Sequence, residues 1–209
     1  MSSQAVRDPV GDPLLTPANC ALILIDYQPI QVKSVGSMDR DLLVDNIVRV
    51  AKIARAYRVP VVLSTVNVTT GRNEPTIPRL LEALGAVTPI DRTAINAWED
   101  RDFVAAVRAT GRRKLVMCAL WTEVCLAFPT LDAMREGYDV YPVVDAIGGT
   151  SLESHRAGLS RVYQGGAVPV SWTALICELQ RDYARTETVS AFMQILFDPR
   201  VPFVAAQHR

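Results

Sequence analysis

Apolar residues along this chain follow two alternating patterns: short unbroken runs, and longer stretches in which they recur every three or four positions. Unbroken runs are typical of strands buried on both faces, and the wider spacing is typical of helices that cover a sheet. The runs predict six strands, at residues 20–25, 60–65, a brief segment before Arg92, 115–121, 140–144 and 168–171. The alternation therefore predicts an α/β protein with a three-layer α/β/α, Rossmann-like fold and a mostly parallel six-stranded sheet.

Helices are predicted between these strands, and the chain is long enough to bury one substantial core. Their apolar positions fall within residues 39–57, 77–84, 102–110, 124–134, 152–163, 174–183 and 189–197. Residues 1–15 are expected to form a loose N-terminal arm, with a single domain over residues 16–209. No glycine-rich nucleotide-binding loop follows the first strand, so the most common use of such a fold lacks its motif.

The stretch from Lys114 to Cys125 is the most informative part of the sequence. Its apolar run ends at Trp121, and Thr122 and Glu123 then supply N-cap and first-turn chemistry for a helix. Cys125 is therefore expected in the first turn of that helix, where open α/β sheets place their ligands. Because a helix N-terminus favours an anion, we expect this thiol to ionise more easily than an ordinary one. The alternative is a buried cysteine that acts only as a small apolar side chain.

Two charged residues follow other predicted strands. Asp26 comes directly after the first strand, and Arg92 follows the third. Each has an ordinary structural explanation, because Asp26 could cap a turn and Arg92 could form a surface ion pair. The carboxyl ends of parallel strands meet at one edge of a sheet, so a thiol, a carboxylate and a guanidinium are expected together there. That combination suits nucleophilic catalysis.

Composition narrows the range of partners. The 22 basic and 22 acidic side chains cancel, and without a basic stripe nucleic acid is not expected to bind. No apolar run approaches the roughly 18 residues that span a membrane, and residues 1–13 lack the order of a signal peptide. We therefore expect a cytoplasmic protein without a membrane partner. The four cysteines are widely spaced and are expected to be free thiols: Cys20, Cys118, Cys125 and Cys177.

Several motifs resemble a known family. Asp26-x-Gln28 after the first strand is in register with Thr122-Glu-Val-Cys125 after the central one, and further similarity lies at residues 95–100, 120–129, 137–146 and 177–182. Together these motifs resemble the isochorismatase-like cysteine hydrolase superfamily, and within it the YcaC-type branch. The similarity spans residues 16–182, so residues 16–209 are interpreted as one isochorismatase-like hydrolase domain.

The resemblance implies a catalytic triad. Asp26 matches the general base and Cys125 the nucleophile, whereas Arg92 stands where the family usually has a lysine. Arginine is a planar fork and lysine a compact donor, so this exchange is expected to alter both thiolate stabilisation and substrate fit. The family also implies a cis peptide bond between Leu120 and Trp121, and an oxyanion hole formed by the backbone N–H groups of Trp121 and Cys125.

The implied activity is hydrolysis of a carbon–nitrogen bond, in an amide or carbamoyl group of a small molecule, through a thioester. The zinc-binding members carry histidines in the loop after the second strand, whereas residues 67–74 contain none. We therefore expect no metal and no cofactor. Five residues are predicted to line the substrate pocket: Gln28, Asn96, Trp98, Trp121 and Thr122.

Two alternatives remain open at this point. One is an isochorismatase-type hydrolase of a vinyl ether, a reaction that needs no thiol. The other is a non-catalytic oligomer that binds a metabolite or carries a redox-responsive cysteine. A homo-oligomer is expected on resemblance, with the apolar residues 189–197 and 201–206 available for subunit contacts. His155 is interpreted as an ordinary hydrogen-bonded or solvated residue on a helix surface.

Overall fold

The computed structural model describes residues 8–198 of the chain. Its strands are β1 (Cys20–Ile25), β2 (Val61–Val66), β3 (Ile90–Arg92), β4 (Lys114–Ala119) and β5 (Asp139–Pro142). Its helices are α1 (Pro29–Lys33), α2 (Arg40–Ala56), α3 (Pro78–Leu84), α4 (Arg101–Ala109), α5 (Ala127–Arg135), α6 (Leu152–Gln164), α7 (Trp172–Gln180) and α8 (Thr186–Leu196). Two single turns complete the set, the 3₁₀ turn η1 (Ala97–Glu99) and the π-helical turn η2 (Thr122–Leu126).

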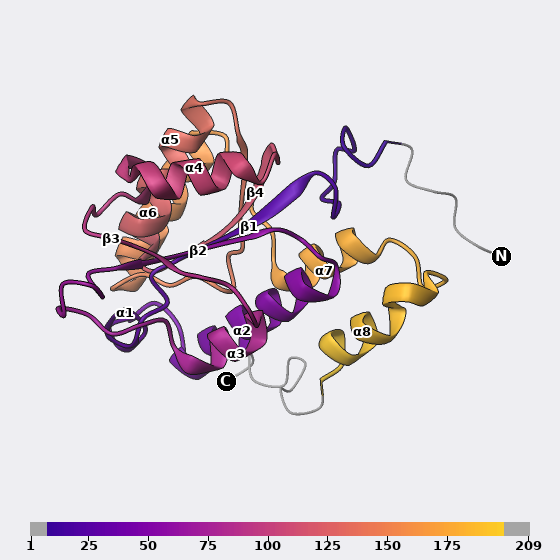
Figure 1. Cartoon of the computed structure of the whole chain (residues 1–209), viewed down its shortest axis with the longest axis horizontal. Helices are drawn as coiled ribbons and strands as arrows, with labels where there is room; N and C mark the ends of the chain where they lie inside the picture. Colours follow the sequence, from indigo (N-terminus) through magenta and orange to yellow (C-terminus); the bar gives the residue numbers. More distant parts are fainter. Residues whose placement is uncertain (1–7, 199–209) are drawn as a thin grey trace.

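Helices cover both faces of one parallel sheet with the strand order β3-β2-β1-β4-β5. Figure 1 shows α4, α5 and α6 on one face and α2, α3, α7 and α8 on the other. Neighbouring parallel strands need a long crossover connection, usually a helix, which is why the two hydrophobic patterns alternate along the chain. The predicted three-layer α/β/α fold is confirmed.

β1 and β4 form the centre of the sheet. Every residue of both strands is buried, and the pairing runs from Cys20 opposite Lys114 to Ile25 opposite Ala119. Burying one such aliphatic side chain contributes about 1.5–3 kcal/mol. These two strands therefore fix the residues that follow them, which emerge side by side at the carboxyl edge of the sheet.

The predicted sixth strand at residues 168–171 is wrong. Among the described residues it contributes only an isolated bridge between Val143 and Val170. The Val168 N–H still donates a 2.9 Å hydrogen bond to β5, so this segment does lie along the edge of that strand. The next bond of the ladder would require an N–H from Pro142 of β5, and proline has none. The ladder is interrupted there, and the sheet ends at β5 with five strands.

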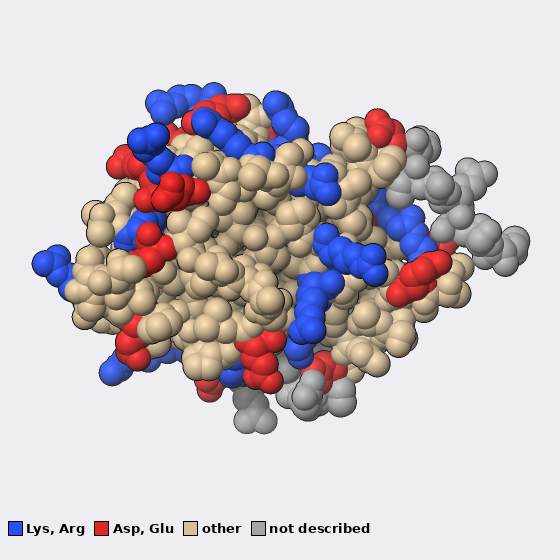
Figure 2. Space-filling model, viewed as in Figure 1, with Lys and Arg blue, Asp and Glu red and all other residues tan. Residues whose placement is uncertain are grey.

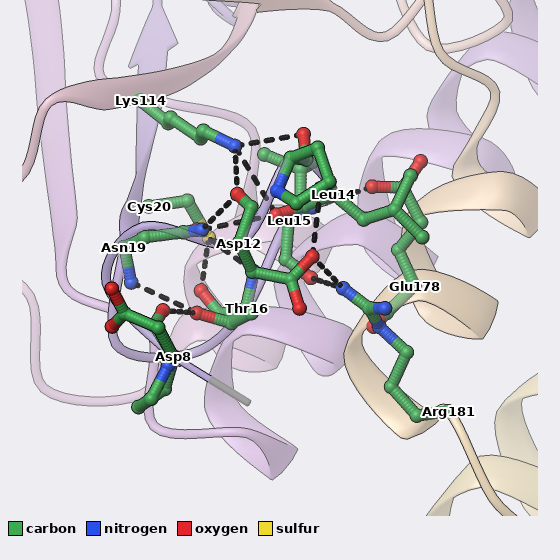
Figure 3. A network of polar contacts seen from close by, with 12 residues as sticks. Asp8, Asp12, Leu14, Leu15, Thr16, Asn19, Cys20, Lys114, Glu178 and Arg181 are labelled. Atoms are coloured by element: carbon green, nitrogen blue, oxygen red, sulfur yellow. Dashed lines mark hydrogen bonds and ion pairs between the residues drawn. The ribbon is translucent and has the colours of Figure 1, made fainter. Parts of the chain in front are cut away.

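The N-terminal segment, expected to be a loose arm, is anchored from Asp12 onward (Figure 3). Lys114 of β4 uses all three donors of its ammonium group on successive backbone carbonyls, those of Asp12 at 2.6 Å, Pro13 at 2.9 Å and Leu14 at 3.2 Å. Arg181 also donates to the Asp12 carboxylate at 2.9 Å. The buried Leu15 donates its N–H to Glu178 of α7 at 2.6 Å. These contacts close the amino edge of the sheet.

The last described helix, α8, packs on α2 through one apolar face. Phe192, Ile195 and Leu196 are buried, whereas Met193 and Phe197 are 42% and 53% exposed. Residues 201–206, the second segment expected at subunit contacts, lie outside the described residues. In the part of the chain from residue 8 to residue 198, no helix is long and apolar enough to cross a membrane. Basic and acidic side chains are interspersed over the face shown in Figure 2.

Candidate active site

Asp26 is fully buried and directly follows β1. Its φ of +62° lies in the left-handed region, which aspartate tolerates better than most residues. Two backbone hydrogen bonds hold this turn, from the Asp26 N–H to the Ser64 carbonyl at 3.0 Å and from the Gln28 N–H to the Asp26 carbonyl at 2.8 Å. Non-glycine residues in this conformation cluster at functional sites. The first strand therefore ends in a turn that keeps a carboxylate inside the protein.

Arg92 meets Asp26 in a two-pronged ion pair. Its Nη1 donates to Asp26 Oδ1 at 2.6 Å and its Nη2 donates to Asp26 Oδ2 at 2.8 Å, and both side chains are fully buried. The backbone carbonyls of Thr65 and Ile95 accept further hydrogen bonds from the guanidinium, at 3.1 and 3.2 Å. Burial alone would lower the pKa of Arg92, but its hydrogen bonds and charge interaction with Asp26 raise it above the ordinary value. The two side chains thus form a fixed, buried pair joined by two hydrogen bonds.

Cys125 lies in η2, the turn that joins β4 to α5. This residue is 8% exposed, and its thiol lies beside the Asp26 carboxylate and the backbone of Trp121, both of which act on its pKa. The peptide bond between Leu120 and Trp121 is cis, as the resemblance implies. Asp26, Arg92 and Cys125, which are far apart in the sequence, are therefore brought together at the carboxyl edge of the sheet.

The expectation that this thiol ionises easily is wrong for the structure as it stands. Burial raises the pKa of Cys125 above its ordinary value, and the charge and hydrogen bond of Asp26 raise it further. Arg92 and the backbone of Trp121 act in the opposite direction but do not compensate. Desolvation of the thiolate outweighs the favourable helix end. The resting group is a neutral thiol that needs a base.

Trp121 and Thr122, both predicted to line the pocket, border this turn. The indole Nε1 of the partly exposed Trp121 donates to the Ser34 hydroxyl at 2.8 Å, next to α1. Thr122 is fully buried, and its hydroxyl lies 2.8 Å from Nδ1 of His155 on α6. Trp121 therefore lies beside the thiol, whereas the Thr122 side chain faces the protein behind it.

Gln28 is fully buried and connects segments of the chain around the site. Its amide nitrogen donates to the carbonyls of Val66 at 3.1 Å and Glu74 at 2.6 Å, and its amide oxygen accepts from the Val66 N–H at 2.9 Å. These three contacts bind the side chain to the end of β2 and to the loop that follows it. In this structure Gln28 shapes the surroundings of the site by holding that loop.

Asn96 and Trp98 are the other predicted pocket residues. Their side chains contact α4 and the α5 region, not the Asp26, Arg92 and Cys125 side chains. The Asn96 side chain caps η1 by accepting from the Trp98 N–H at 3.0 Å and donates to Asp132 at 2.7 Å. The buried Trp98 ring packs edge-on against Phe103, and its Nε1 donates to Glu136 at 3.0 Å. Both residues brace the segment after β3, in which Ile95 accepts a hydrogen bond from Arg92.

The loop at residues 67–74, where zinc-binding relatives would carry histidines, is held by Asp91 of β3. Its carboxylate accepts hydrogen bonds from Thr65, Val68 and Thr69 at 2.7–3.1 Å. Although burial opposes it, these hydrogen bonds lower the pKa of Asp91 to about 2. Within residues 8–198, no group of three or more His, Cys, Asp or Glu side chains is arranged to hold a metal ion. The absence of a metal or cofactor stays a prediction.

Sequence reasoning missed the part that His155 plays beside this site. The sequence predicts a solvated or hydrogen-bonded residue on the helix surface, whereas His155 is partly buried and its hydrogen bond is to the turn that carries Cys125. One signal was available: Gly158 lies one turn further along the same helix face, and small residues on a helix face permit close packing.

The fold and this site together define a class of three-layer α/β/α proteins with a cysteine in the turn after the central strand and an aspartate after the neighbouring one. The isochorismatase domain model matches residues 20–174, and the chain belongs to the isochorismatase family. It is 36% identical over 166 residues to the probable hydrolase YcaC of Escherichia coli (strain K12), a match that covers 79% of each chain.

Two solved structures support the YcaC-type resemblance. YcaC from Pseudomonas aeruginosa, solved with hexane-2,5-diol and covalent acrylamide, has a TM-score of 0.83 and 35% identity, over 88% of this chain and 90% of that one. The YcaC gene product from Escherichia coli, described as an octameric hydrolase of unknown specificity, has a TM-score of 0.78 and 30% identity, over 90% and 97% of the two chains. The predicted resemblance is confirmed.

Proposed function

We propose that this protein is a cysteine hydrolase that cleaves a carbon–nitrogen bond, in an amide or carbamoyl group of a small molecule, through a thioester on Cys125. One observation carries the proposal: the Cys125 thiol lies beside a buried carboxylate that Arg92 holds by both oxygens. A neutral thiol is a weak nucleophile, and an adjacent base activates it. The membership of a family whose YcaC relatives are described as hydrolases supports this reading.

The reaction begins with transfer of the Cys125 proton to Asp26 as the sulfur attacks the substrate carbonyl carbon. The tetrahedral intermediate collapses when Asp26 gives that proton to the leaving nitrogen, so that the carbon–nitrogen bond breaks and the amine departs. A water molecule then loses a proton to Asp26 and attacks the thioester carbon. The acid leaves as the carbon–sulfur bond breaks, and Asp26 returns the proton to the sulfur.

In this scheme Arg92 holds the Asp26 carboxylate in place while that carboxylate takes up and returns the proton. A carboxylate oxygen has two lone-pair directions, so each Asp26 oxygen can hold the guanidinium and still accept a proton. Arg92 Nε is buried and has no hydrogen-bond partner among the described residues, which leaves one donor for a substrate atom or a water molecule. The planar guanidinium holds the two Asp26 oxygens with two separate nitrogens, whereas a lysine would offer a single nitrogen.

The oxyanion hole is proposed to consist of the backbone N–H groups of Trp121 and Cys125. In the resting structure the Trp121 backbone lies close enough to the sulfur to act on its pKa, which supports its position near the reacting atoms. Donors aimed at the developing oxyanion usually contribute the largest single part of catalysis. Among the predicted pocket residues, Trp121 has the best support as a residue that contacts the substrate. Gln28 and Thr122 are proposed to support the pocket indirectly, by holding the segments that surround it.

A homo-oligomer is proposed as the working form, since the similar Escherichia coli YcaC is described as octameric. The exposed apolar side chain of Met193 on α8 supports subunit contacts there. A cytoplasmic location is also proposed. It is supported by four cysteines that are all free thiols, a pattern typical of reducing compartments.

A second candidate function is hydrolysis of a vinyl ether of the isochorismatase type, which the name of the matching family model favours. The two reactions differ in their need for sulfur. A vinyl ether hydrolase would use the acidic Asp26 and would keep its activity when the thiol is removed.

The test compares wild type with Cys125→Ala in a screen of small amides and ureas for ammonia release. The wild type is expected to release ammonia from at least one substrate, and the variant is expected to have no activity while its circular dichroism spectrum stays unchanged. A matched control is Cys177→Ala, which removes a thiol remote from the site and should leave turnover unchanged. Full activity in Cys125→Ala would contradict the covalent mechanism.

A further inference from the structure

Helix α6 packs directly against the backbone of η2, the turn that carries Cys125. Gly158 lies at the contact, where an added Cβ would be 2.8 Å from Glu123 Cα and 3.0 Å from the Thr122 carbonyl carbon. Real Cβ atoms do not approach backbone so closely, so only glycine fits this position without movement. The position of α6 therefore sets the position of the turn.

His155 is the polar contact between these two elements. It lies three residues before Gly158 and so faces the same side of α6. Its Nδ1 is 2.8 Å from the hydroxyl of Thr122, which is fully buried and also donates its backbone N–H to the Gly148 carbonyl at 2.9 Å. Thr122 directly follows Trp121, whose backbone lies close enough to the Cys125 sulfur to act on its pKa. The Thr122 contact is therefore one residue away from the backbone that borders the sulfur.

Glu123, the next residue of this turn, contacts Thr150. Its Oε1 accepts hydrogen bonds from the N–H and hydroxyl of Thr150 at 3.0 and 2.6 Å, and its buried Oε2 has no partner within residues 8–198. Burial lowers the pKa of His155, and the nearby charge of Glu123 opposes but does not cancel this effect. A neutral imidazole offers one donor and one acceptor, which matches a single bond to a hydroxyl group.

We propose that His155 is a positioning residue: its hydrogen bond with Thr122 holds η2 so that the Trp121 backbone lies against the Cys125 sulfur and the thiol lies beside Asp26. The proposal rests on the proposed function only in treating Cys125 as the nucleophile. Since the Trp121 backbone lowers the thiol pKa, release of Thr122 makes the thiolate harder to form. A loosened turn without this positioning role would expose the sulfur and make it react faster, so the two effects have opposite signs.

The experiment measures the second-order rate constant for alkylation of Cys125 by iodoacetamide at pH 8, with the modified site resolved by peptide mass spectrometry. The variants are His155→Ala, His155→Asn, Thr122→Val and the double variant His155→Ala/Thr122→Val. Arg156→Ala is the matched control, since Arg156 is exposed on the same helix. Cys177, which is exposed, serves as an internal reference thiol in every sample.

His155→Ala is expected to slow alkylation of Cys125 about fivefold, the order of effect of one hydrogen bond. Thr122→Val should slow it to a similar extent, and the double variant should be no slower than either, because both changes remove the same contact. His155→Asn should stay within about twofold of wild type, because an amide can bond the Thr122 hydroxyl in place of Nδ1. Arg156→Ala and the Cys177 reference should not change.

An unchanged or faster rate in His155→Ala would overturn the proposal, and so would additive effects in the double variant. If His155→Ala does not fold, Thr122→Val compared with Thr122→Ser carries the test, since the serine keeps the hydroxyl and should react like wild type. The readout needs no turnover. A failure to hydrolyse any amide would therefore count against the proposed function and leave this measurement intact.

Discussion

Strands β1 and β4 lie side by side, and each end of the pair has a cluster of charged side chains around a cysteine. At the amino end, the Lys114 ammonium is bound by three backbone carbonyls, and Arg181 pairs with Asp12 where both side chains keep some exposure. At the carboxyl end, Arg92 pairs with Asp26 by two hydrogen bonds with no exposure at all. Lys114 thus fastens the N-terminal segment to the sheet, whereas Arg92 holds the carboxylate of Asp26.

The two cysteines show what this difference means for chemistry. Burial raises the pKa of Cys20 to about 12 despite the neighbouring Arg112 and Lys114, and it also raises the pKa of Cys125 despite Arg92. A nearby cation is therefore not enough to activate a buried thiol. The Cys20 sulfur bonds a backbone carbonyl, that of Thr16 at 3.1 Å, which cannot take its proton at neutral pH. The Cys125 thiol instead lies beside the Asp26 carboxylate, whose oxygens have lone pairs that can accept a proton.

The largest effect is expected from Asp26→Asn, which leaves Arg92 buried without a counter-charge. Breaking one partner of a buried pair costs about 3–5 kcal/mol of unfolding free energy. The variant should also lose turnover, because the amide cannot accept the thiol proton. Urea unfolding measures the first effect and ammonia release the second.

The control for Asp26→Asn is the double variant Asp26→Leu/Arg92→Met, which removes both charges. It should recover most of the lost stability but none of the activity, since apolar residues can replace a buried pair without a stability cost. A single variant as stable as wild type would show that the pair is not held as described.

An intermediate effect is expected from Lys114→Met at the amino end. Loss of three hydrogen bonds to the N-terminal segment should lower the free energy of unfolding by about 1–3 kcal/mol. The alkylation rate of Cys125 should stay at the wild-type value, because the site lies at the other end of both strands. A changed alkylation rate of Cys125 would show that the amino end of β1 and β4 is not only structural and that it influences the site at the carboxyl end.

The smallest effect is expected from Asp12→Asn, and it should depend on pH. The hydrogen bond from Arg181 is the main cause that holds the pKa of Asp12 below its ordinary value of 3.8. A lowered pKa means that the ionised form stabilises the fold above pH 3.8 and that this contribution is lost as the pH falls below that value. The difference in urea midpoint between wild type and variant should therefore be present at pH 7 and shrink toward pH 3. A difference that is equal at both values would contradict the ion pair.

Much of the fold could be predicted because burial on both faces leaves an unbroken apolar run, as in Cys20–Ile25 of β1. The meeting of Asp26, Arg92 and Cys125 followed from the geometry of parallel strands, which brings all carboxyl ends to one edge. Hydrophobicity alone could not show that residues 168–171 do not form a strand. Their ladder with β5 is interrupted because Pro142, on another segment, has no N–H to donate. Local pattern does not report such a pairing.

Other features depend on contacts between distant residues. Asn96 and Trp98 are turned away from the thiol by Asp132 and Glu136, which lie more than thirty positions later in the chain. The raised pKa of Cys125 reflects burial and a neighbouring carboxylate, which outweigh the helix end that the sequence made visible. Such balances are set by tertiary packing.

The most direct test of the account is acid-quenched mass spectrometry of the protein during turnover of a pool of small amides. The thioester mechanism predicts a mass increase of one acyl group on the peptide that contains Cys125, and an unmodified peptide for Cys20 at the opposite end of the same strands. Hydrolysis that proceeds with an unmodified Cys125, or with the acyl group on any other residue, would contradict it.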